Sequence, residues 1–472
     1  MSDTKENGVV ADGNRAANEI FETMPVPAAL AKMAIPTIAS QLVTLIYNIA
    51  DTWFIGQTDN PYMVAASSLV LTIFLMTSAI ANLFGVGGGS LVVRLLGSRQ
   101  EEEAKKVASL SLVMAGGAAL TFSLVCLVFM NPVLRLLGAS DNTIGYASQY
   151  LFFVVVLGSF PTVLSSTMSS MVRNIGHSKE AGFGLSMGGV LNVILDPVFM
   201  FVILPDGYQV VGAAFATMLS NVVVFFYFIR VYRRLKDSTI LELPRRVEKI
   251  QKDSMASMFS VGVPAAMSLF LYDLTNMVIN RLSAAHGDIA LAAMGIVLKV
   301  ERLPLNTGIG ICLGMTPLVA YNYAAKNYRR MKEFFSAARI AGLAVALLCV
   351  VLYRSFAPYI MAAFISDGDT VSLGTEVMRA RCFAPPFMFL SFHMVHFMQA
   401  INRGKYSFYM AVIRQLCLNI PILFVANWLF GLNGIIWTQA IADIINVAIS
   451  YMIYHRVMKQ VVAGYSSIKV IL

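Results

Sequence analysis

The sequence is poor in charged residues, which occupy only 13% of its 472 positions, whereas 57% of the residues are hydrophobic and the mean hydropathy is +0.70. Soluble globular proteins carry about 25% charged residues, so this composition excludes that class. The apolar runs are about 20 residues or longer, enough to cross a hydrocarbon core roughly 30 Å thick. They lack the alternation of outer-membrane barrel strands. Helices are therefore expected to span the membrane.

Cysteine is also scarce, and no secretory signal peptide is evident. The five cysteines are Cys126, Cys312, Cys349, Cys382 and Cys417. They lie in or beside apolar runs without the spacing of a metal site, so we interpret them as packing residues. Residues 1–24 are polar and lack the apolar core of a signal peptide. We expect them to remain as a disordered cytoplasmic tail.

About twelve membrane spans follow from the apolar runs. They are expected to start near Pro27, Pro61, Val107, Ile144, Glu180, Val210, Ser254, Asp288, Phe334, Ser372, Tyr406 and Leu432. Lysine and arginine gather in the loops after even-numbered spans, for example at Arg99 and Lys326, whereas several odd-numbered loops carry none. By the positive-inside rule both termini are expected in the cytoplasm. The net charge of +9 then reflects topology and not nucleic-acid binding.

The two halves of the chain repeat each other. Superposing Pro36 on Pro264 also matches Ser40 with Ser268, and "VGAAFATMLSN" echoes "LNGIIWTQAIAD" in glycine spacing. The predicted fold is an all-α integral membrane protein with two six-helix repeats of the same orientation. We expect an N-terminal lobe at 25–235, a cytoplasmic inter-lobe loop at 236–253, a C-terminal lobe at 254–460 and a cytoplasmic tail at 461–472.

A polar stripe runs along the first span. Gln41, Thr44, Asn48 and Asp51 recur at spacings of three and four residues, which places them on one helical face. Charged and polar groups at that depth are expensive in lipid, so this face must meet protein or water. The same region is expected to contribute to an ion site or a substrate cavity.

A second acidic position lies in "LNVILDPVF", where Asn192 and Asp196 are one helical turn apart. Pro197 cannot donate to the carbonyl of Val193, which leaves that oxygen available. Two carboxylates, amide oxygens and a freed carbonyl suit a small hard cation, and Thr217 on the sixth span is a further candidate ligand. The same groups suit a proton equally well. The alternative is that Asp196 only caps a broken helix or pairs with a lysine.

The second half has its own polar residues. Asp273, Asn276 and Asn280 form a stripe on the seventh span, and "LKVER" on the eighth carries Lys299 and Glu301. A pair between Asp273 and Lys299 is expected, either as a buried salt bridge or as a switch between two packings. Glu301 points away from Lys299.

The glycine-rich run "GVGGGS", Gly85 to Ser90, lacks the lysine and serine or threonine that end a phosphate-binding loop. Its position in a membrane helix favours close helix packing or a hinge.

"NIADTWFIGQ", "NVILDPVF", "GAAFAT" and the six-plus-six repeat resemble the multidrug and toxic compound extrusion (MATE) family, in particular its DinF-like prokaryotic branch. The resemblance implies two six-helix lobes in a V shape. It assigns cation or proton coupling to Asp51, Asn192, Asp196 and Thr217, with Asp51, Asn192 and Asp196 as Na⁺ ligands. The second half lacks an Asp-Pro counterpart and offers Asn419 and Pro421 in "LNIPILF" instead, so coupling is expected in the first half.

The resemblance also implies a secondary active antiporter of the bacterial or archaeal inner membrane that expels cationic amphipathic drugs as Na⁺ or H⁺ enters. It is expected to act as a monomer in membrane lipid, with no cofactor, no catalytic residues and no nucleic-acid partner. Gln41, Asn48, Asp273, Asn276, Lys299 and Glu301 are the expected cavity or second-lobe polar residues. The alternatives are a flippase for lipid-linked precursors and an intramembrane aspartyl protease. The flippase needs a cationic cavity, and the protease needs a Gly-x-Gly-Asp motif that the sequence lacks.

Overall fold

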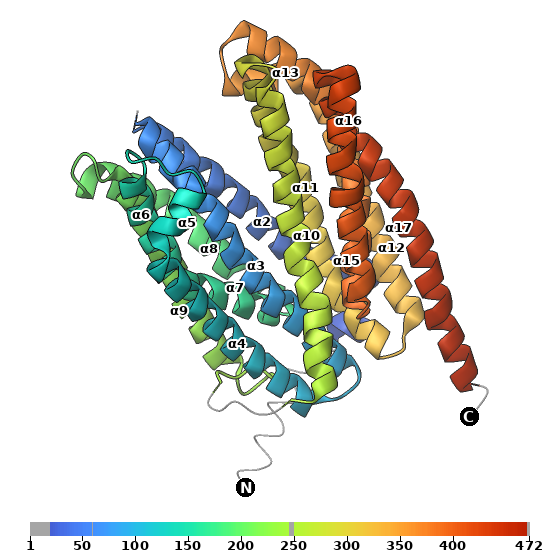
Figure 1. Ribbon diagram of the computed structural model, residues 1–472. Helices are drawn as coiled ribbons and strands as arrows, with labels where there is room; N and C mark the ends of the chain where they lie inside the picture. The colour runs from blue at the N-terminus through green and yellow to red at the C-terminus, as the bar shows by residue number, and fades with distance from the viewer. Residues whose placement is uncertain (1–18, 59, 245–249, 470–472) are drawn as a thin grey trace. The chain divides into compact units, whose positions relative to one another are not determined.

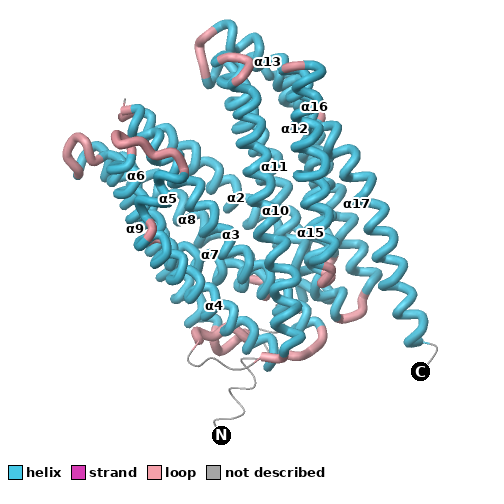
Figure 2. Tube along the Cα trace, viewed as in Figure 1, coloured by secondary structure: helices cyan, strands magenta, loops and turns pink. Residues whose placement is uncertain are grey.

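The structure is a computed structural model that describes residues 19–58, 60–244 and 250–469, and within these ranges the regular elements are all helices joined by short loops (Figure 2). The first half contains η1 (Glu19–Thr23), α2 (Val26–Gly56), α3 (Pro61–Gly97), α4 (Glu101–Val128), α5 (Met130–Leu136), α6 (Ile144–Leu151), η2 (Phe152–Leu157), α7 (Ser159–Asn174), α8 (Ser178–Pro197), η3 (Val198–Ile203) and α9 (Gln209–Leu235). The second half contains α10 (Lys252–Ala284), α11 (Asp288–Ala324), α12 (Tyr328–Phe364), α13 (Gly368–Arg381), α14 (Ala384–Ala400), α15 (Gly404–Val412), η4 (Ile413–Asn419), α16 (Ile420–Phe430) and α17 (Leu432–Lys469). The η elements are π-helical turns.

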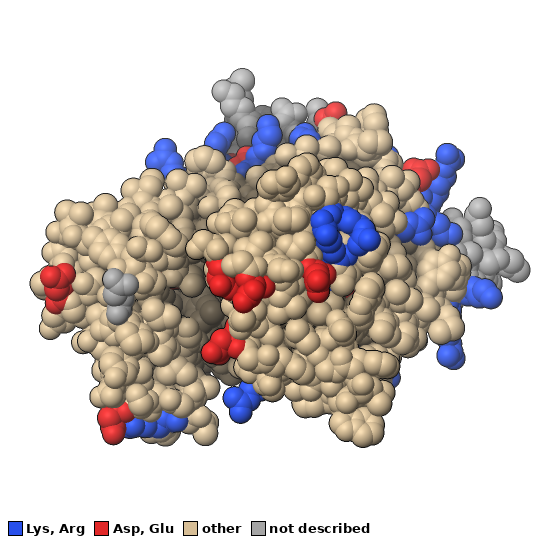
Figure 3. All heavy atoms as spheres, turned by 90° about the horizontal axis from the view of Figure 1, so that it is seen from above, with Lys and Arg blue, Asp and Glu red and all other residues tan. Residues whose placement is uncertain are grey.

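Ten described helices are long and apolar enough to span a membrane, and the bent pair Ile144–Leu157 and Ser159–Asn174, which turns by 44°, makes an eleventh. The remaining expected span falls on α13 and α14, which have 14 and 17 residues. The helices begin close to the expected positions, with the largest differences at α4 and α12. Most of the face seen in Figure 3 carries no charged side chain, in keeping with the low charge content of the sequence.

Local sequence explains two of the helix starts. Pro61 occupies the first turn of α3, where its missing N–H costs nothing, and Asn60 caps the helix by accepting from the backbone N–H of Tyr62 at 3.0 Å. Asp367 caps α13 by accepting from the backbone N–H of Thr370 at 2.9 Å.

The chain divides into two compact units. Unit 1 comprises residues 1–266, 313–335 and 400–402, and unit 2 comprises residues 267–312, 336–399 and 403–472. Unit 1 therefore contains the whole first half together with the start of α10, the end of α11, the start of α12 and the loop after α14. In unit 1, α2 packs along α8, and α3 packs against α4 and α7 (Figure 1).

Glycines bring the helices of unit 1 into close contact. A Cβ atom on Gly182 of α8 would overlap the carbonyl oxygen of Pro36 in α2. A Cβ on Gly87 would overlap the carbonyl oxygen of Met258, at the start of α10. Gly88 and Gly89 meet neighbouring side chains just as closely. The expectation that "GVGGGS" serves close helix packing is thus confirmed.

The backbone repeats in the two halves. Arg99 and Lys326 both adopt positive φ in the loops after α3 and α11, and they lie 227 positions apart. Gly176 and Asn402 do the same after α7 and α14, 226 positions apart. These turns sit at the same places in the two six-helix sets, so the repeat predicted from the sequence is present in the fold.

Residues 19–24, expected as part of a loose tail, form a packed turn in unit 1, while residues 1–18 lie outside the described ranges. Phe21 is buried and stacks on Tyr321 of α11 with ring centroids 4.8 Å apart. Glu22 accepts hydrogen bonds from Arg99 at 2.8 Å and from Tyr321 at 2.5 Å. Arg330 of α12 donates to the Phe21 carbonyl at 2.8 Å. This turn therefore joins the start of α2 to the ends of α3 and α11 and to the start of α12.

Four of the cysteines are buried and Cys417 is exposed, and all five are free thiols. The four buried residues fit the expected packing role.

Candidate functional site

The first candidate site lies where α8 changes its geometry. The helix is α-helical up to Pro197 and continues as the π-helical turn η3. Such turns widen a helix locally and occur often at functional sites. Asn192 and Asp196, one turn apart on the α-helical side of this change, are both buried.

The hydrogen bonds of Asn192 join α8 to α9. Its amide Nδ2 donates to Asp196 Oδ1 at 3.2 Å and to Thr217 Oγ1 on α9 at 3.1 Å. This uses the two donors of the amide and leaves Asn192 Oδ1 and Asp196 Oδ2 buried without a hydrogen-bond partner. Three of the four residues predicted to form the site are therefore in direct contact.

Asp51 contributes the second carboxylate from α2, the helix that packs along α8. Its Oδ1 atom is also buried and without a partner. Tyr47, one turn before Asp51 on α2, meets α8, because a Cβ on Gly189 would lie 3.2 Å from its ring.

The unpartnered atoms of this site are all oxygens, from two carboxylates and one amide. A carboxylate offers only acceptors, so each of these atoms needs a donor or a cation to offset its burial. Hard oxygen ligands suit Na⁺ or a proton, and the set contains no sulfur or imidazole. Among the described residues, no group of three His, Cys, Asp or Glu side chains could hold a metal ion.

The other polar residues of α2 continue away from Asp51 along the helix. Asn48 is exposed, and Gln41 and Thr44 are half-buried. They lie one to three turns from Asp51 along α2.

In unit 2 the expected pair between Asp273 and Lys299 is replaced by another. Asp273 accepts from Arg302 Nη2 at 3.1 Å, while Lys299 is exposed. Arg302 and Lys299 are three residues apart on one side of α11, and the longer, forked guanidinium reaches the carboxylate. Asn276 lies one turn after Tyr272 on the same face of α10.

Glu301 has a buried partner from α13. Arg381 donates to its two oxygens from Nε at 2.8 Å and Nη2 at 2.9 Å. This forked geometry is the strongest that an arginine and a carboxylate can adopt. Glu301 is therefore held in an ion pair, with both of its oxygens engaged.

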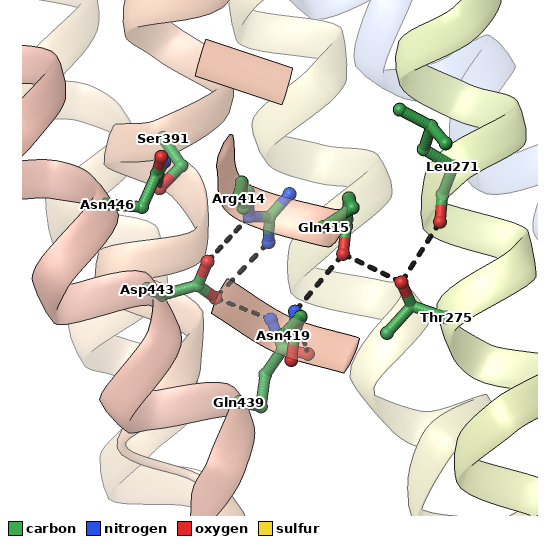
Figure 4. A network of polar contacts seen from close by, with 9 residues as sticks. All are labelled: Leu271, Thr275, Ser391, Arg414, Gln415, Asn419, Gln439, Asp443 and Asn446. Carbon is green, nitrogen blue, oxygen red and sulfur yellow. Dashed lines mark hydrogen bonds and ion pairs between the residues drawn. The ribbon is translucent and has the colours of Figure 1, made fainter. Parts of the chain in front are cut away.

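Figure 4 shows a polar network in unit 2 that sequence patterns did not predict. Arg414 of η4 and Asp443 of α17 form a buried ion pair, with Nε to Oδ1 at 2.6 Å and Nη2 to Oδ2 at 3.2 Å. The signal was available, since an arginine and an aspartate each interrupt a long apolar run.

Comparison with known proteins identifies the chain. The family model MatE matches residues 36–198 and 264–425. The chain belongs to the MatE family. The two matched segments of this MatE chain begin at Pro36 and Pro264, the residues that superpose in the internal repeat.

This MatE chain is 31% identical over 425 residues to the multidrug export protein MepA of Staphylococcus aureus (strain MSSA476), covering 90% of this chain and 92% of the relative. It is 30% identical over 448 residues to MepA of Staphylococcus haemolyticus, covering 95% of this chain and 97% of that relative. The expected family is confirmed, and MatE proteins are membrane transporters, not enzymes.

Solved structures share the fold. An outward-facing multidrug resistance MATE transporter of the MOP superfamily superposes with a TM-score of 0.87 at 21% identity, covering 94% of this MatE chain and 98% of the other. A mutant of the Vibrio cholerae MATE transporter VcmN superposes with a TM-score of 0.85 at 20% identity, covering 93% of this chain and 99% of the other. The predicted fold class is thus confirmed.

Proposed function

We propose that this MatE chain is a secondary multidrug efflux transporter in which one inward-moving cation, Na⁺ or H⁺, binds at Asp51 and Asp196 and drives the export of cationic amphipathic drugs. The relatives reported above are named multidrug export proteins. The observation that carries the coupling site is the set of buried, unpartnered oxygens on Asp51, Asn192 and Asp196.

The contrast with unit 2 supports this assignment. Asp273, Glu301 and Asp443 each pair with an arginine. Among the described residues, neither Asp51 nor Asp196 forms an ion pair with lysine, arginine or histidine. An acid that is buried without a fixed cation is costly, and an exchangeable cation would offset that cost.

Each residue of the site then has a role. Asp51 and Asp196 supply the negative charge. Asn192 fixes the Asp196 carboxylate by donating to Oδ1 and keeps its own Oδ1 available as a ligand. Thr217 anchors the amide from α9 and offers its hydroxyl oxygen. With the cation bound, the site is less charged and the helices around it can repack, which biases the transporter between two access states.

The membrane potential sets the available driving force. Moving one elementary charge across 100 mV is worth about 2.3 kcal/mol, which could sustain roughly a fifty-fold gradient of a neutral drug. A drug with a single positive charge that leaves in exchange cancels this electrical contribution. The chemical gradient of the ion must then drive export.

We further propose that both termini face the cytoplasm of a bacterial or archaeal cell. The loops rich in lysine and arginine lie together at one end of unit 1. Lys105 bonds Glu242 at 3.2 Å, Glu103 accepts from Ser254 at 2.9 Å, and Ser257 donates to Asn402 at 2.9 Å. One basic end supports a cytoplasmic orientation.

The test is dye efflux from cells that express the wild type, Asp51→Asn or Asp196→Asn, with the sodium and proton gradients collapsed separately. We expect the wild type to expel ethidium and to lose this activity when one of the two gradients is removed. Both variants should fail to pump although they are present in the membrane. The matched control is Asp206→Asn, which makes the same chemical change at an exposed aspartate in the loop before α9 and should leave efflux intact.

Normal pumping by both variants would refute the site. A wild type that moves no dye under any gradient would refute drug export and would favour the flippase alternative.

A further inference from the structure

The two units contain the same hairpin, and its register can be read from glycine contacts. A Cβ on Gly212 of α9 would lie 2.8 Å from the backbone of Phe199 in η3. A Cβ on Gly434 of α17 would overlap the carbonyl oxygen of Ala426 in α16. Gly212 and Gly434 are 222 positions apart, and Phe199 and Ala426 are 227 apart. Residues of α8 and η3 therefore correspond to residues 227 positions later, and residues of α9 to residues 222 positions later.

This register pairs the candidate cation site with the network of Figure 4. Asn192 corresponds to Asn419, and Thr217 corresponds to Gln439. The hydrogen bond from the asparagine to the neighbouring helix is present in both units. Asn192 Nδ2 donates to Thr217 Oγ1 at 3.1 Å in unit 1, and Asn419 Nδ2 donates to Gln439 Oε1 at 3.3 Å in unit 2. Unit 2 thus carries a counterpart of the cation site.

The carboxylates of the site are absent from this counterpart. Asp196 corresponds to Leu423, and Asp51 corresponds to Ile279 in the register set by Pro36 and Pro264. Both replacing side chains are buried in the hydrophobic core of unit 2. The positions that would hold an exchangeable cation are therefore apolar.

The counterpart instead contains a charge of its own. Both oxygens of Asp443 are engaged, because Arg414 bonds each of them and Gln439 Nε2 donates to Oδ2 at 2.6 Å. The guanidinium also lies 4.7 Å from the centroid of the Phe392 ring. Gln415 closes the other side of the network, where it accepts from Asn419 at 3.1 Å and from Thr275 at 2.9 Å.

We propose that Arg414 is a built-in cation that closes the second-unit counterpart of the ion site, so that the transporter exchanges ions only at Asp51 and Asp196. This inference rests on the proposed function, since it concerns where the coupling ion binds. An entering ion would have to displace a forked guanidinium from a buried carboxylate, and the uncompensated arginine would remain behind. The open acceptors of the network, Asn419 Oδ1 and Asn446 Oδ1, are neutral amide oxygens and supply no charge.

The test measures ion binding to purified protein in detergent, with radioactive sodium and with proton uptake as separate readouts. The wild type should bind one ion or proton that Asp51→Asn/Asp196→Asn does not bind. Adding Arg414→Gln to that double variant should restore binding of one cation, because Asp443 is then left without its guanidinium. Adding Asp443→Asn as well should abolish the restored binding.

A double variant that removes both charges of the ion pair serves as the control for misfolding. Arg414→Gln/Asp443→Asn in the otherwise unchanged chain removes the ion pair without leaving a buried charge. It should bind the same number of ions as the wild type with the same affinity. Arg414→Lys in the Asp51→Asn/Asp196→Asn background keeps the positive charge and should restore no binding.

The inference is overturned if Asp51→Asn/Asp196→Asn still binds an ion that Asp443→Asn removes, or if the folded Arg414→Gln variant of that background gains no binding. Loss of an ion in Arg414→Gln/Asp443→Asn would also overturn it. If the wild type binds neither ion, the proposed function fails, and the gain caused by Arg414→Gln still decides whether Arg414 closes the counterpart.

Discussion

Replacing Glu301 with glutamine should destabilise the protein strongly, because it leaves Arg381 buried without its carboxylate. The side chain of Arg381 is 2% exposed and that of Glu301 is 7% exposed, and two hydrogen bonds of 2.8 and 2.9 Å join them. Breaking one partner of a buried pair costs roughly 3 to 5 kcal/mol. At about 1.4 kcal/mol per factor of ten, this lowers the folding equilibrium constant at least about a hundredfold.

Glu333→Gln provides the matched control. Glu333 bonds Arg329 at 3.0 Å, one turn away on α12, but the two side chains are 44% and 90% exposed. Exposed pairs of this spacing contribute about 0.3 to 0.5 kcal/mol. The chemical change is the same in the two variants, so the difference between them reports the burial and the second hydrogen bond of the Glu301 pair.

The assay is unfolding in detergent in a Cys417→Ser background, followed with a thiol-reactive dye that reports exposure of the four buried cysteines. Glu301→Gln should unfold at a clearly lower temperature than Glu333→Gln. The double variant Glu301→Gln/Arg381→Met should recover most of the loss, because no buried charge remains. Equal unfolding of Glu301→Gln and Glu333→Gln would refute the reasoning.

Three further perturbations follow from local contacts. Gly182→Val should prevent close packing of α8 on α2 and greatly reduce the amount of folded protein in membranes. Gly117→Ala, whose Cβ would meet nothing within 4 Å, should be tolerated. Both variants are measured as the yield of monodisperse protein after extraction. Phe21→Ala should lose roughly 3 kcal/mol of local packing and increase amide hydrogen exchange in residues 313–335; unchanged exchange would contradict the packed turn. Two hydrogen bonds from Thr370 lower the pKa of Asp367, so its cap on α13 should persist at neutral pH and weaken only as acid protonates the carboxylate. This weakening should appear as faster amide hydrogen exchange at the start of α13, and Asp367→Asn should not show it.

The sequence predicted the spans well because each is a long apolar run with a recognisable start, such as the proline and asparagine at the start of α3. The repeat was equally visible, since Pro36 and Pro264 superpose. The packing of residues 19–24 was missed because a short polar stretch carries no periodic signal. Phe21 gains its partner, Tyr321, from a helix far away in the sequence.

The candidate site was predictable for a physical reason, namely that acids and amides are costly in lipid and stand out in an apolar run. Asn192, Asp196 and Thr217 proved to be in contact. The choice of partner was not predictable, because it depends on helix packing. Asp273 pairs with Arg302 and not with Lys299, although both cations lie on the same side of α11.

The most direct test of the coupling site is to measure drug exit and ion entry together in proteoliposomes with an imposed sodium or proton gradient. We expect one of the two ions to enter as the drug leaves, and we expect Asp51→Asn and Asp196→Asn each to abolish both fluxes. Ion-driven drug export that continues at the wild-type rate in Asp51→Asn/Asp196→Asn would contradict coupling at these two carboxylates.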